Sequence, residues 1–486
     1  MPCSANVLAP ASPVERARYI TDHLPPHLFR SVAGDAAPQA TQVAWRITPE
    51  PFPLAPATVA RLHTIGADLL KFYRALNKIY FQSVRGSAPA FVHEYLELGK
   101  PEQIVRLQRQ NRFKQDTPAV IRPDIILTER IMDDGMIAAE LDAVPGGMGF
   151  VGAMGETYCE LGFDQVGEFD GIVRGFAAMA RSHTGKERPV IAIVVSNESD
   201  DYRGEMVWLA QALSRAGLAE AIAIRPEEVV FTEEALVVDT PAGRRTVDLL
   251  YRFFELFDLL NIPKQELFFY AARHKRVVVT PPPKSFFEEK LTFTLLHHPT
   301  LESLWREDMG DDAFGRVARL FPKTWILDPR PMQPQGTVYD LQVGGRPVHA
   351  WSQLYPLTKS ERQYVVKPSG FSELSWGSKG VYVADDLTKN EWMAVLDGGL
   401  AMFEKTPHLL QRFHKGRRVQ IPYYDPKAQD VKQMDGRVRL CPYYFVAGDE
   451  AKLSGVLATI VPSDKRIIHG MSTAVMAPCA VAEGGH

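Results

Sequence analysis

The sequence predicts an α+β fold of several packed units, with a helical N-terminal layer and an α/β unit in the middle of the chain. Helical segments dominate the first part of the chain, and a strand–helix–strand pattern follows over 190–279. The C-terminal half alternates strand-like runs with loops and one helix. Because 486 residues exceed what one small core requires, we expect roughly two to four units and room for a deep cleft.

The composition is that of a globular protein, with 45% hydrophobic and 23% charged residues. The 55 basic and 58 acidic side chains give a formal net charge of -3. This balance supplies no overall positive field for a polyanionic backbone, so we do not expect nucleic acid as a partner. No run reaches the roughly 18 apolar residues of a membrane span, and no signal-peptide pattern opens the chain. We therefore expect neither membrane insertion nor export.

The four cysteines also bear on the cellular compartment. They lie far apart and without CxxC spacing, so neither a zinc knuckle nor a disulfide scaffold is expected. They are Cys3, Cys159, Cys441 and Cys479. We expect a cytoplasmic protein.

The N-terminal region, 1–115, is predicted to be mainly helical, with proline-rich loops. Its clearest helix is expected over 60–78, where apolar residues recur at helical spacing. These include Leu62, Ile65, Leu69 and Phe72.

The second region, 116–189, begins with two extended runs between residues 120 and 143. Asp133, Asp134 and Gly135 separate them, and this turn chemistry predicts a β-hairpin. A small α/β domain is expected over 190–279, since a buried strand, a helix and further strands follow one another there.

The last region, 280–486, is predicted to begin at a proline run, 281–283, which cannot continue a strand. A helix is expected over 284–298 and another near 387–402. Strands are expected between them and beyond. No internal repeat or low-complexity linker separates the regions, so we expect them to pack against each other.

The hairpin carries charges at alternate positions. Arg122 and Asp124 share one face of the first strand, as Glu140 and Asp142 do on the second. A loop centred between residues 132 and 133 would place Asp124 opposite Leu141, flanked by the other two carboxylates. Three such carboxylates suit Mg²⁺, which prefers oxygen ligands. A solvated outer face is the alternative, and the glycines in the following segment, 145–149, favour the metal site only modestly.

A second candidate site lies at a glycine-rich loop. Lys367 ends a strand-like run and is followed by small and polar residues that can cradle phosphate oxygens. The candidate loop residues are Ser369, Gly370, Gly377, Ser378 and Gly380. A polar hairpin connection with a surface lysine is the alternative. Lys290, at the start of the helix expected after the prolines, is a weaker candidate, because most helical lysines face water.

Other residues rank lower. Arg437 and Arg439 share a strand face and could touch phosphate or an acyl intermediate, although such pairs more often form an exposed face. Cys159 with His183 could be imagined as a thiol hydrolase, but a buried structural cysteine is the preferred interpretation.

In this order, the segments resemble the circularly permuted ATP-grasp proteins related to glutathionylspermidine synthases. In that family the acidic strands come early, as in Arg122-Pro123-Asp124 and Glu140-Leu141-Asp142 here. The similarity extends from about residue 120 to the C-terminus. Its further motifs are Tyr202 with Glu205, Asp248 to Arg252, Lys290, Lys367-Pro368, the glycine-rich loop, and Leu410-Gln411.

The resemblance implies a role for each candidate. Asp124, Glu140 and Asp142 would bind Mg²⁺, and Lys290 and Lys367 would hold ATP phosphates with the loop residues. Gln411 would stand at the adenine hinge, and the candidate catalytic residues are Arg122, Arg252 and Arg439. The chain departs from the family at Asp142, where asparagine is usual, in the proline-glycine turn after it, and in a longer phosphate loop.

The activity implied is that of an ATP-dependent ligase that joins a carboxylate to an amine through an acyl phosphate. The family implies a peptide or amino-acid acid and a polyamine or amino-acid amine, but the substrates are not identified and neither is the oligomeric state. A non-catalytic nucleotide-binding or scaffold protein of the same fold is one alternative. A phosphotransferase that stops at phosphorylation is another.

Overall fold

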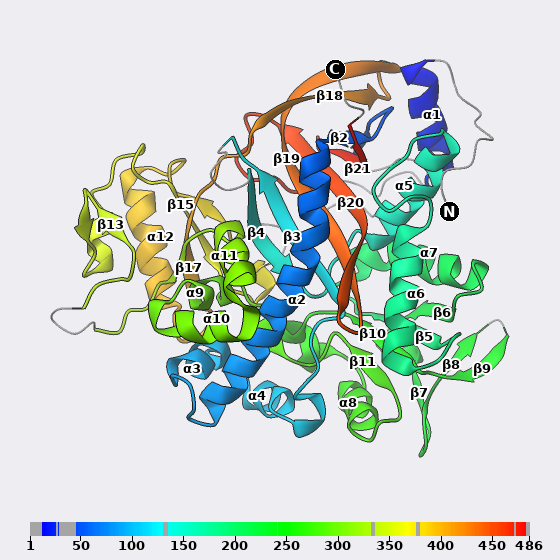
Figure 1. The fold of residues 1–486 in the computed structure, drawn as a ribbon, viewed down its shortest axis with the longest axis horizontal. Coiled ribbons are helices and arrows are strands. Elements are labelled where there is room, and N and C mark those ends of the chain that lie inside the picture. Colours follow the sequence, from blue (N-terminus) through cyan, green and yellow to red (C-terminus); the bar gives the residue numbers. More distant parts are fainter. Residues whose placement is uncertain are drawn as a thin grey trace.

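The computed structural model describes residues 12–25, 28, 45–129, 135–240, 242–331, 336–375, 380–470 and 473–482. In these ranges helices and several β-sheets form a mixed α+β structure, as predicted (Figure 1). None of the helices in the described ranges is long and apolar enough to cross a membrane.

The largest sheet among the described residues has eight strands, in the order β1-β21-β20-β19-β3-β4, with β18 paired to β19 and β2 to β21. Its strands come from both ends of the described chain, so the N-terminal region is not only helical. They are β1 (Arg46–Ile47), β2 (Phe52–Leu54), β3 (Val120–Leu127), β4 (Met136–Asp142), β18 (Arg418–Asp425), β19 (Asp430–Ala447), β20 (Glu450–Pro462) and β21 (Val475–Val481).

Two four-stranded sheets accompany it within the same ranges. The first is parallel, in the order β11-β10-β5-β6, as the strand–helix–strand pattern predicts. It contains β5 (Val190–Val195), β6 (Glu220–Ile224), β10 (Leu249–Phe253) and β11 (Val278–Thr280). The second is antiparallel, in the order β12-β17-β15-β16. It contains β12 (Thr324–Ile326), β15 (Tyr364–Pro368), β16 (Tyr382–Val383) and β17 (His408–Arg412).

The smaller strands pair locally, β7 with β8 and β9, and β13 with β14. They are β7 (Val230–Phe231), β8 (Leu236–Thr240), β9 (Gly243–Thr246), β13 (Gln342–Val343) and β14 (Arg346–Pro347). The helices are α1 (Pro13–His23), α2 (Pro56–Val84), α3 (Phe91–Glu97), α4 (Glu102–Gln108), α5 (Met148–Glu160), α6 (Gly171–Thr184), α7 (Arg203–Arg215), α8 (Gln265–Arg273), α9 (Thr292–Leu296), α10 (Glu302–Met309), α11 (Asp311–Leu320) and α12 (Lys389–Ala401).

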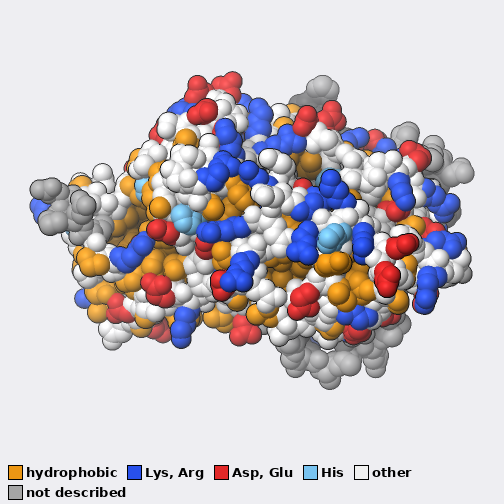
Figure 2. All heavy atoms as spheres, turned by 90° about the horizontal axis from the view of Figure 1, so that it is seen from below, with side chains coloured by type: hydrophobic (Ala, Val, Ile, Leu, Met, Phe, Trp, Pro, Cys, Tyr) orange, Lys and Arg blue, Asp and Glu red, His pale blue; other side chains and the backbone are white. Residues whose placement is uncertain are grey.

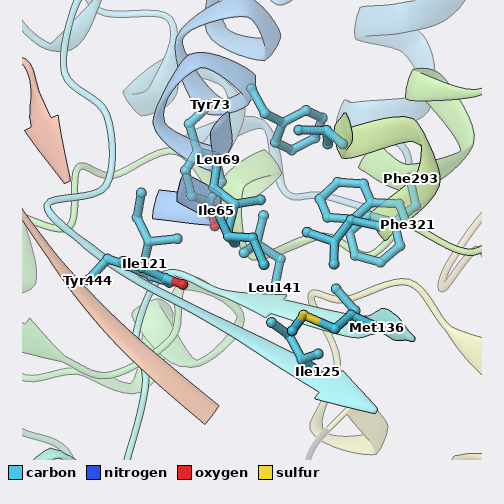
Figure 3. Close-up of a cluster of buried hydrophobic side chains, with 14 of the residues drawn as sticks. Ile65, Leu69, Tyr73, Ile121, Ile125, Met136, Leu141, Phe293, Phe321 and Tyr444 are labelled. Carbon is cyan, nitrogen blue, oxygen red and sulfur yellow. The ribbon is translucent and has the colours of Figure 1, made fainter. Parts of the chain in front are cut away.

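Helix α2 contains the helix predicted over 60–78 and extends it in both directions. Its apolar face packs on the hairpin of β3 and β4, together with aromatic side chains near α9 (Figure 3). Ile65 and Leu69 of α2 lie close to Ile121 and Ile125 of β3 in this cluster. Burial of apolar surface stabilises the fold by about 25 cal/mol per Å², so the apolar face of the hairpin is held against α2.

The register of the hairpin differs from the prediction. Asp124 lies opposite Glu140 and not opposite Leu141. A β-bulge at Ala139 separates the pairs Asp124–Glu140 and Ile125–Ala138. The extra residue reverses the alternation of β4. Side chains before and after the bulge can therefore both turn toward α2, while Glu140 and Asp142 share the opposite face with Arg122 and Asp124. The residues at the predicted loop centre lie outside the described ranges.

The helix predicted over 284–298 is not continuous. A 3-10 turn, η6 (Ser285–Glu288), is followed by the extended residue Glu289, a turn at 290–291 and then α9. A tertiary partner takes a backbone donor that a continuous helix would use, since Lys290 N–H bonds the carbonyl of Ser369. Ser285 N–H bonds Gln108. Lys290 thus lies in the connection between η6 and α9. The helix predicted near 387–402 is found as α12.

Charge and apolar surface are unevenly distributed despite the small net charge. Figure 2 shows a face on which Lys and Arg side chains gather near the centre, between hydrophobic areas. Several large apolar side chains are exposed around α8, namely Leu260, Leu267 and Tyr270. Such isolated exposure is common on protein surfaces.

Candidate functional site

The charged face of the hairpin gathers most of the predicted site residues. Arg122 lies opposite Asp142, and Asp124 lies opposite Glu140. Strand β19 pairs with β3 on its other side, with Arg439 opposite Ile126, and so adds an arginine to the same face. The face turned toward α2 is apolar, so packing on one side presents the charges on the other.

Asp124 is held by cations from two strands. Its carboxylate lies 3.2 Å from Nε of Arg122 and 2.6 Å from Nη1 of Arg439, and the Cys441 thiol donates to it at 3.3 Å. Burial alone would raise the pKa of Asp124, but the two arginines lower the pKa below its ordinary value. The carboxylate is therefore ionised and committed to protein partners.

Arg122 connects Asp124 to the next carboxylate and to the turn after β4. It pairs with Asp142 and donates from Nη1 to the Gly146 carbonyl at 2.9 Å. Burial raises the pKa of Asp142 to about 6 against the opposing effect of Arg122, and Asp124 and Glu140 contribute to the rise. Two negative charges near Asp142 thus make its ionised form less favourable.

Two lysines approach this face from other parts of the chain. Nζ of Lys290 lies 3.8 Å from Glu140, and Nζ of Lys367, on β15, donates to the Ala139 carbonyl at 2.8 Å. The β-bulge therefore presents the carbonyl that joins the antiparallel four-stranded sheet to the hairpin. Burial lowers the pKa of Lys367 to about 8, with Glu140 opposing and Lys290 assisting the shift. Glu140 and Asp142 raise the pKa of Lys290 despite its burial.

The start of the glycine-rich loop is fixed by the same segment that carries Lys290. The Ser369 hydroxyl donates to Glu289 and accepts from the Leu291 N–H at 3.0 Å. A side chain at Gly370 would lie 2.5 Å from the Glu288 carbonyl, and one at Gly380 would lie 2.9 Å from Pro368. Both glycines thus permit close backbone packing. Gly377 and Ser378 lie outside the described ranges.

Two predicted site residues, Arg252 and Gln411, and the lower-ranked candidate Arg437 are not brought into contact with the cluster. Arg252 is 1% exposed and donates to the carbonyls of Phe254, Pro281 and Pro282 and to Glu288, so it stabilises the proline segment. Gln411 is buried on β17, where it donates to the Thr324 hydroxyl at 3.0 Å. Arg437 donates to the backbone carbonyls of Ser463 and Gly416 and is buried, which contradicts an exposed arginine face.

The carboxylates do not form a ready three-ligand metal site. In the described part of the chain, no three His, Cys, Asp or Glu side chains are grouped to hold one ion. Asp124, with a side chain 3% exposed, faces the two arginines. The side chains of Glu140 and Asp142 are 30% and 31% exposed. Two carboxylates with water and phosphate oxygens form a donor set that suits Mg²⁺.

Sequence reasoning missed the role of Glu205 as a site-supporting residue. Its carboxylate is fully buried and accepts from the N–H groups of Gly147 at 2.6 Å and Phe150 at 3.4 Å, at the start of α5. Burial raises the pKa of Glu205 to about 7 against these hydrogen bonds. The Tyr-x-x-Glu motif singled out Glu205 in the sequence, but it did not indicate that Glu205 would bind the backbone at the start of α5.

The glycines of segment 145–149 serve packing within the protein. A side chain at Gly146 would overlap the Tyr202 ring, and one at Gly147 would overlap the Tyr443 hydroxyl. Gly147 also has φ 90°, which favours glycine. The Gly146 carbonyl accepts from Tyr443 at 2.8 Å as well as from Arg122. These contacts fix the turn against the charged face.

Comparisons with known proteins identify the fold. No family model matches the chain, and no curated protein matches it by sequence. Among solved structures, a glutathione synthetase-like effector from Globodera pallida, in its apo form, is 12% identical, with a TM-score of 0.57 over 96% of this chain and 97% of that one. A putative gamma-glutamylcysteine synthetase from Methylobacillus flagellatus is 13% identical, with a TM-score of 0.40 over 78% and 83% of the two chains. The first likeness extends over nearly the whole of both chains, and the protein accordingly has a fold similar to that of the glutathione synthetase-like effector.

Proposed function

We propose that this protein is an ATP-dependent carboxylate–amine ligase of the circularly permuted ATP-grasp kind. The observation that supports it best is the meeting of two lysines with the carboxylate face. Lys367 comes from one sheet, Lys290 from the segment before α9, and Glu140 and Asp142 from the hairpin. Cations beside partly exposed carboxylates suit the phosphate chain of a nucleotide and its metal ion.

The likeness to the glutathione synthetase-like effector supports the proposal at the level of fold only. A shared fold does not establish activity. The residues add independent support, because the lysines and carboxylates singled out from the sequence meet in space. The proposed substrates are a small carboxylic acid and an amine, of the peptide, amino-acid or polyamine type.

In the proposed reaction the substrate carboxylate attacks the γ-phosphorus of ATP, the bond to the β,γ-bridging oxygen breaks, and ADP leaves. The amine then attacks the resulting acyl phosphate, loses a proton and releases phosphate. Lys290 and Lys367 would hold phosphate oxygens and neutralise the charge that develops on them. Arg122 and Arg439 would stabilise the acyl phosphate. Nε of Arg439 is buried and has no hydrogen-bond partner in the described structure, and the buried Nε of Arg122 has only the ion pair with Asp124, at 3.2 Å.

Mg²⁺ would be held by Glu140 and Asp142 and would neutralise phosphate charge when bound. Asp124 would orient Arg122 and Arg439 toward the substrate, since its carboxylate binds both. Its assignment as a metal ligand is thereby replaced by a positioning role in this proposal. The pair Arg122–Asp142 would have to adjust for metal binding.

The test begins with binding. Mg-ATP and Mg-ADP at millimolar concentration should raise the melting temperature, because a ligand that binds only the folded state stabilises it by mass action. A panel of acids and amines is then assayed for ADP release, and mass spectrometry identifies the adduct. Absence of nucleotide binding would overturn the proposal. Binding without turnover would indicate a scaffold protein, and ADP release without an amine-dependent product would indicate a phosphotransferase.

A further inference from the structure

A buried lysine of the N-terminal region reaches the segment that holds Lys290. Lys100 lies in the turn between α3 and α4, and its Nζ pairs with Glu289 Oε1. The two side chains are only 1% and 3% exposed. A buried ion pair of this kind is costly to break, because removal of one partner leaves an uncompensated charge.

Glu289 transmits this contact to the glycine-rich loop. Its other oxygen, Oε2, accepts from the Ser369 hydroxyl. Ser369 in turn accepts from Leu291 N–H through its hydroxyl and from Lys290 N–H through its carbonyl, the latter at 2.8 Å. Ser369 follows Lys367 by two residues, so one serine connects the backbones of both phosphate-binding candidates.

The surroundings of Lys100 leave little freedom. Gly99 has φ 72°, and a side chain there would overlap the Lys405 carbonyl. The Ser369 N–H donates to the Pro407 carbonyl at 2.9 Å, from the same neighbouring segment. The Phe371 ring centroid lies 5.4 Å from Lys100 Nζ, within the range of a cation–π contact. The turn at 99–100 and the start of the loop are thus packed as one unit.

We infer that Lys100 is a positioning residue of the nucleotide site. Through Glu289 and Ser369 it fixes the backbone segments that carry Lys290 and Lys367 relative to each other. The inference rests on the proposed function, and it extends the site to the turn between α3 and α4. No sequence motif marks this lysine.

The experiment compares Lys100→Met, Lys100→Arg, Glu289→Gln and the double variant Lys100→Met/Glu289→Gln with the parent. Lys284→Met is the matched control: Lys284 is a buried lysine that bonds Asn77 and the carbonyls of residues 114 and 116, away from the loop. The dissociation constant of Mg-ATP is measured by calorimetry, and the melting temperature by circular dichroism. Amide exchange of Lys290 and Leu291 reports on their bonds to Ser369.

Lys100→Met is expected to weaken Mg-ATP binding about tenfold, and Lys100→Arg to retain it. The double variant, which leaves no unpaired charge, should regain thermal stability but not nucleotide affinity. Amide exchange at Lys290 and Leu291 should be faster in Lys100→Met and in the double variant than in the parent. It should stay at the parent level in Lys284→Met. Parent affinity and parent exchange in the double variant would overturn the inference. If the parent binds no Mg-ATP but exchange at Lys290 and Leu291 is still faster in Lys100→Met than in the parent, the positioning role is supported and the proposed function alone is refuted.

Discussion

Glu205→Gln should change the pH dependence of stability in a calculable way. Glu205 is fully buried at the start of α5, and burial raises its pKa to about 7 from an ordinary value of 4.5. In the unfolded chain the group titrates near the ordinary value. Between these two pH values the folded state binds more protons than the unfolded state, so the stability contributed by Glu205 decreases as pH rises.

The magnitude follows from the two pKa values. The difference of about 2.5 pH units corresponds to about 3 kcal/mol at 1.36 kcal/mol per unit. This contribution is fully present below pH 4.5 and is lost once the pH has passed about 7. Glutamine does not titrate and resembles the protonated acid in shape. The unfolding free energy of the parent relative to the variant should therefore fall by about 3 kcal/mol from pH 4.5 to 7.5.

Urea denaturation of both proteins at four pH values between 4.5 and 7.5 measures this difference. Other carboxyl groups titrate in both proteins, so the difference isolates Glu205. Equal slopes of unfolding free energy against urea concentration at each pH would confirm that the two proteins expose the same surface on unfolding. A difference in unfolding free energy that does not change with pH would refute the burial argument, and one that increases with pH would reverse its sign.

Four further predictions concern the site. Glu140→Gln should lower ADP release at least about a hundredfold while circular dichroism stays unchanged, because it removes a proposed metal ligand; a parent rate would exclude metal binding there. Lys367→Ala should weaken Mg-ATP binding about tenfold, as measured by calorimetry. The affinity of the parent should fall above pH 8, where Lys367 loses its charge. An unchanged dissociation constant in the variant would contradict a contact between Lys367 and phosphate. EDTA should remove most of the ATP-induced rise in melting temperature, whereas a persistent shift would indicate metal-free binding. Gly147→Ala should cost about 1–3 kcal/mol in unfolding free energy, since φ is 90° and the methyl group would meet Tyr443; parent stability would show that the turn can relax.

Much of the candidate site was predictable because charge alternation is a local property. The spacing predicted that Arg122 and Asp124 share a face of the first strand and that Glu140 and Asp142 share a face of the second. The observed pairing brings these two faces together. The pairing was one residue off, because the register depends on the turn and on the bulge at Ala139, and charge alternation determines neither. The ion pair between Asp124 and Arg439 was not predictable, because the two residues lie more than 300 positions apart in the chain.

Contacts made by single residues far apart in the chain were not predictable. The chemistry of Arg252 suits both an acyl phosphate and a set of backbone carbonyls, and only the structure shows the second. Lys290 was expected on a helix, but Ser369 takes its backbone N–H. Lys100 had no periodicity or motif around it. In each case a tertiary hydrogen bond or ion pair overrides local preference.

The pairing of β1 and β2 with β21 has a consequence for biosynthesis. These strands run parallel, with Arg46 beside Val475 and Phe52 beside Cys479. The largest sheet therefore cannot be completed until its last strands have left the ribosome. During that interval the hairpin of β3 and β4 is present without β19, and Asp124 has Arg122 but not Arg439 as a counterion. We expect the nascent chain to expose an unpaired strand edge for most of its synthesis, the condition under which chaperone binding and aggregation compete with folding.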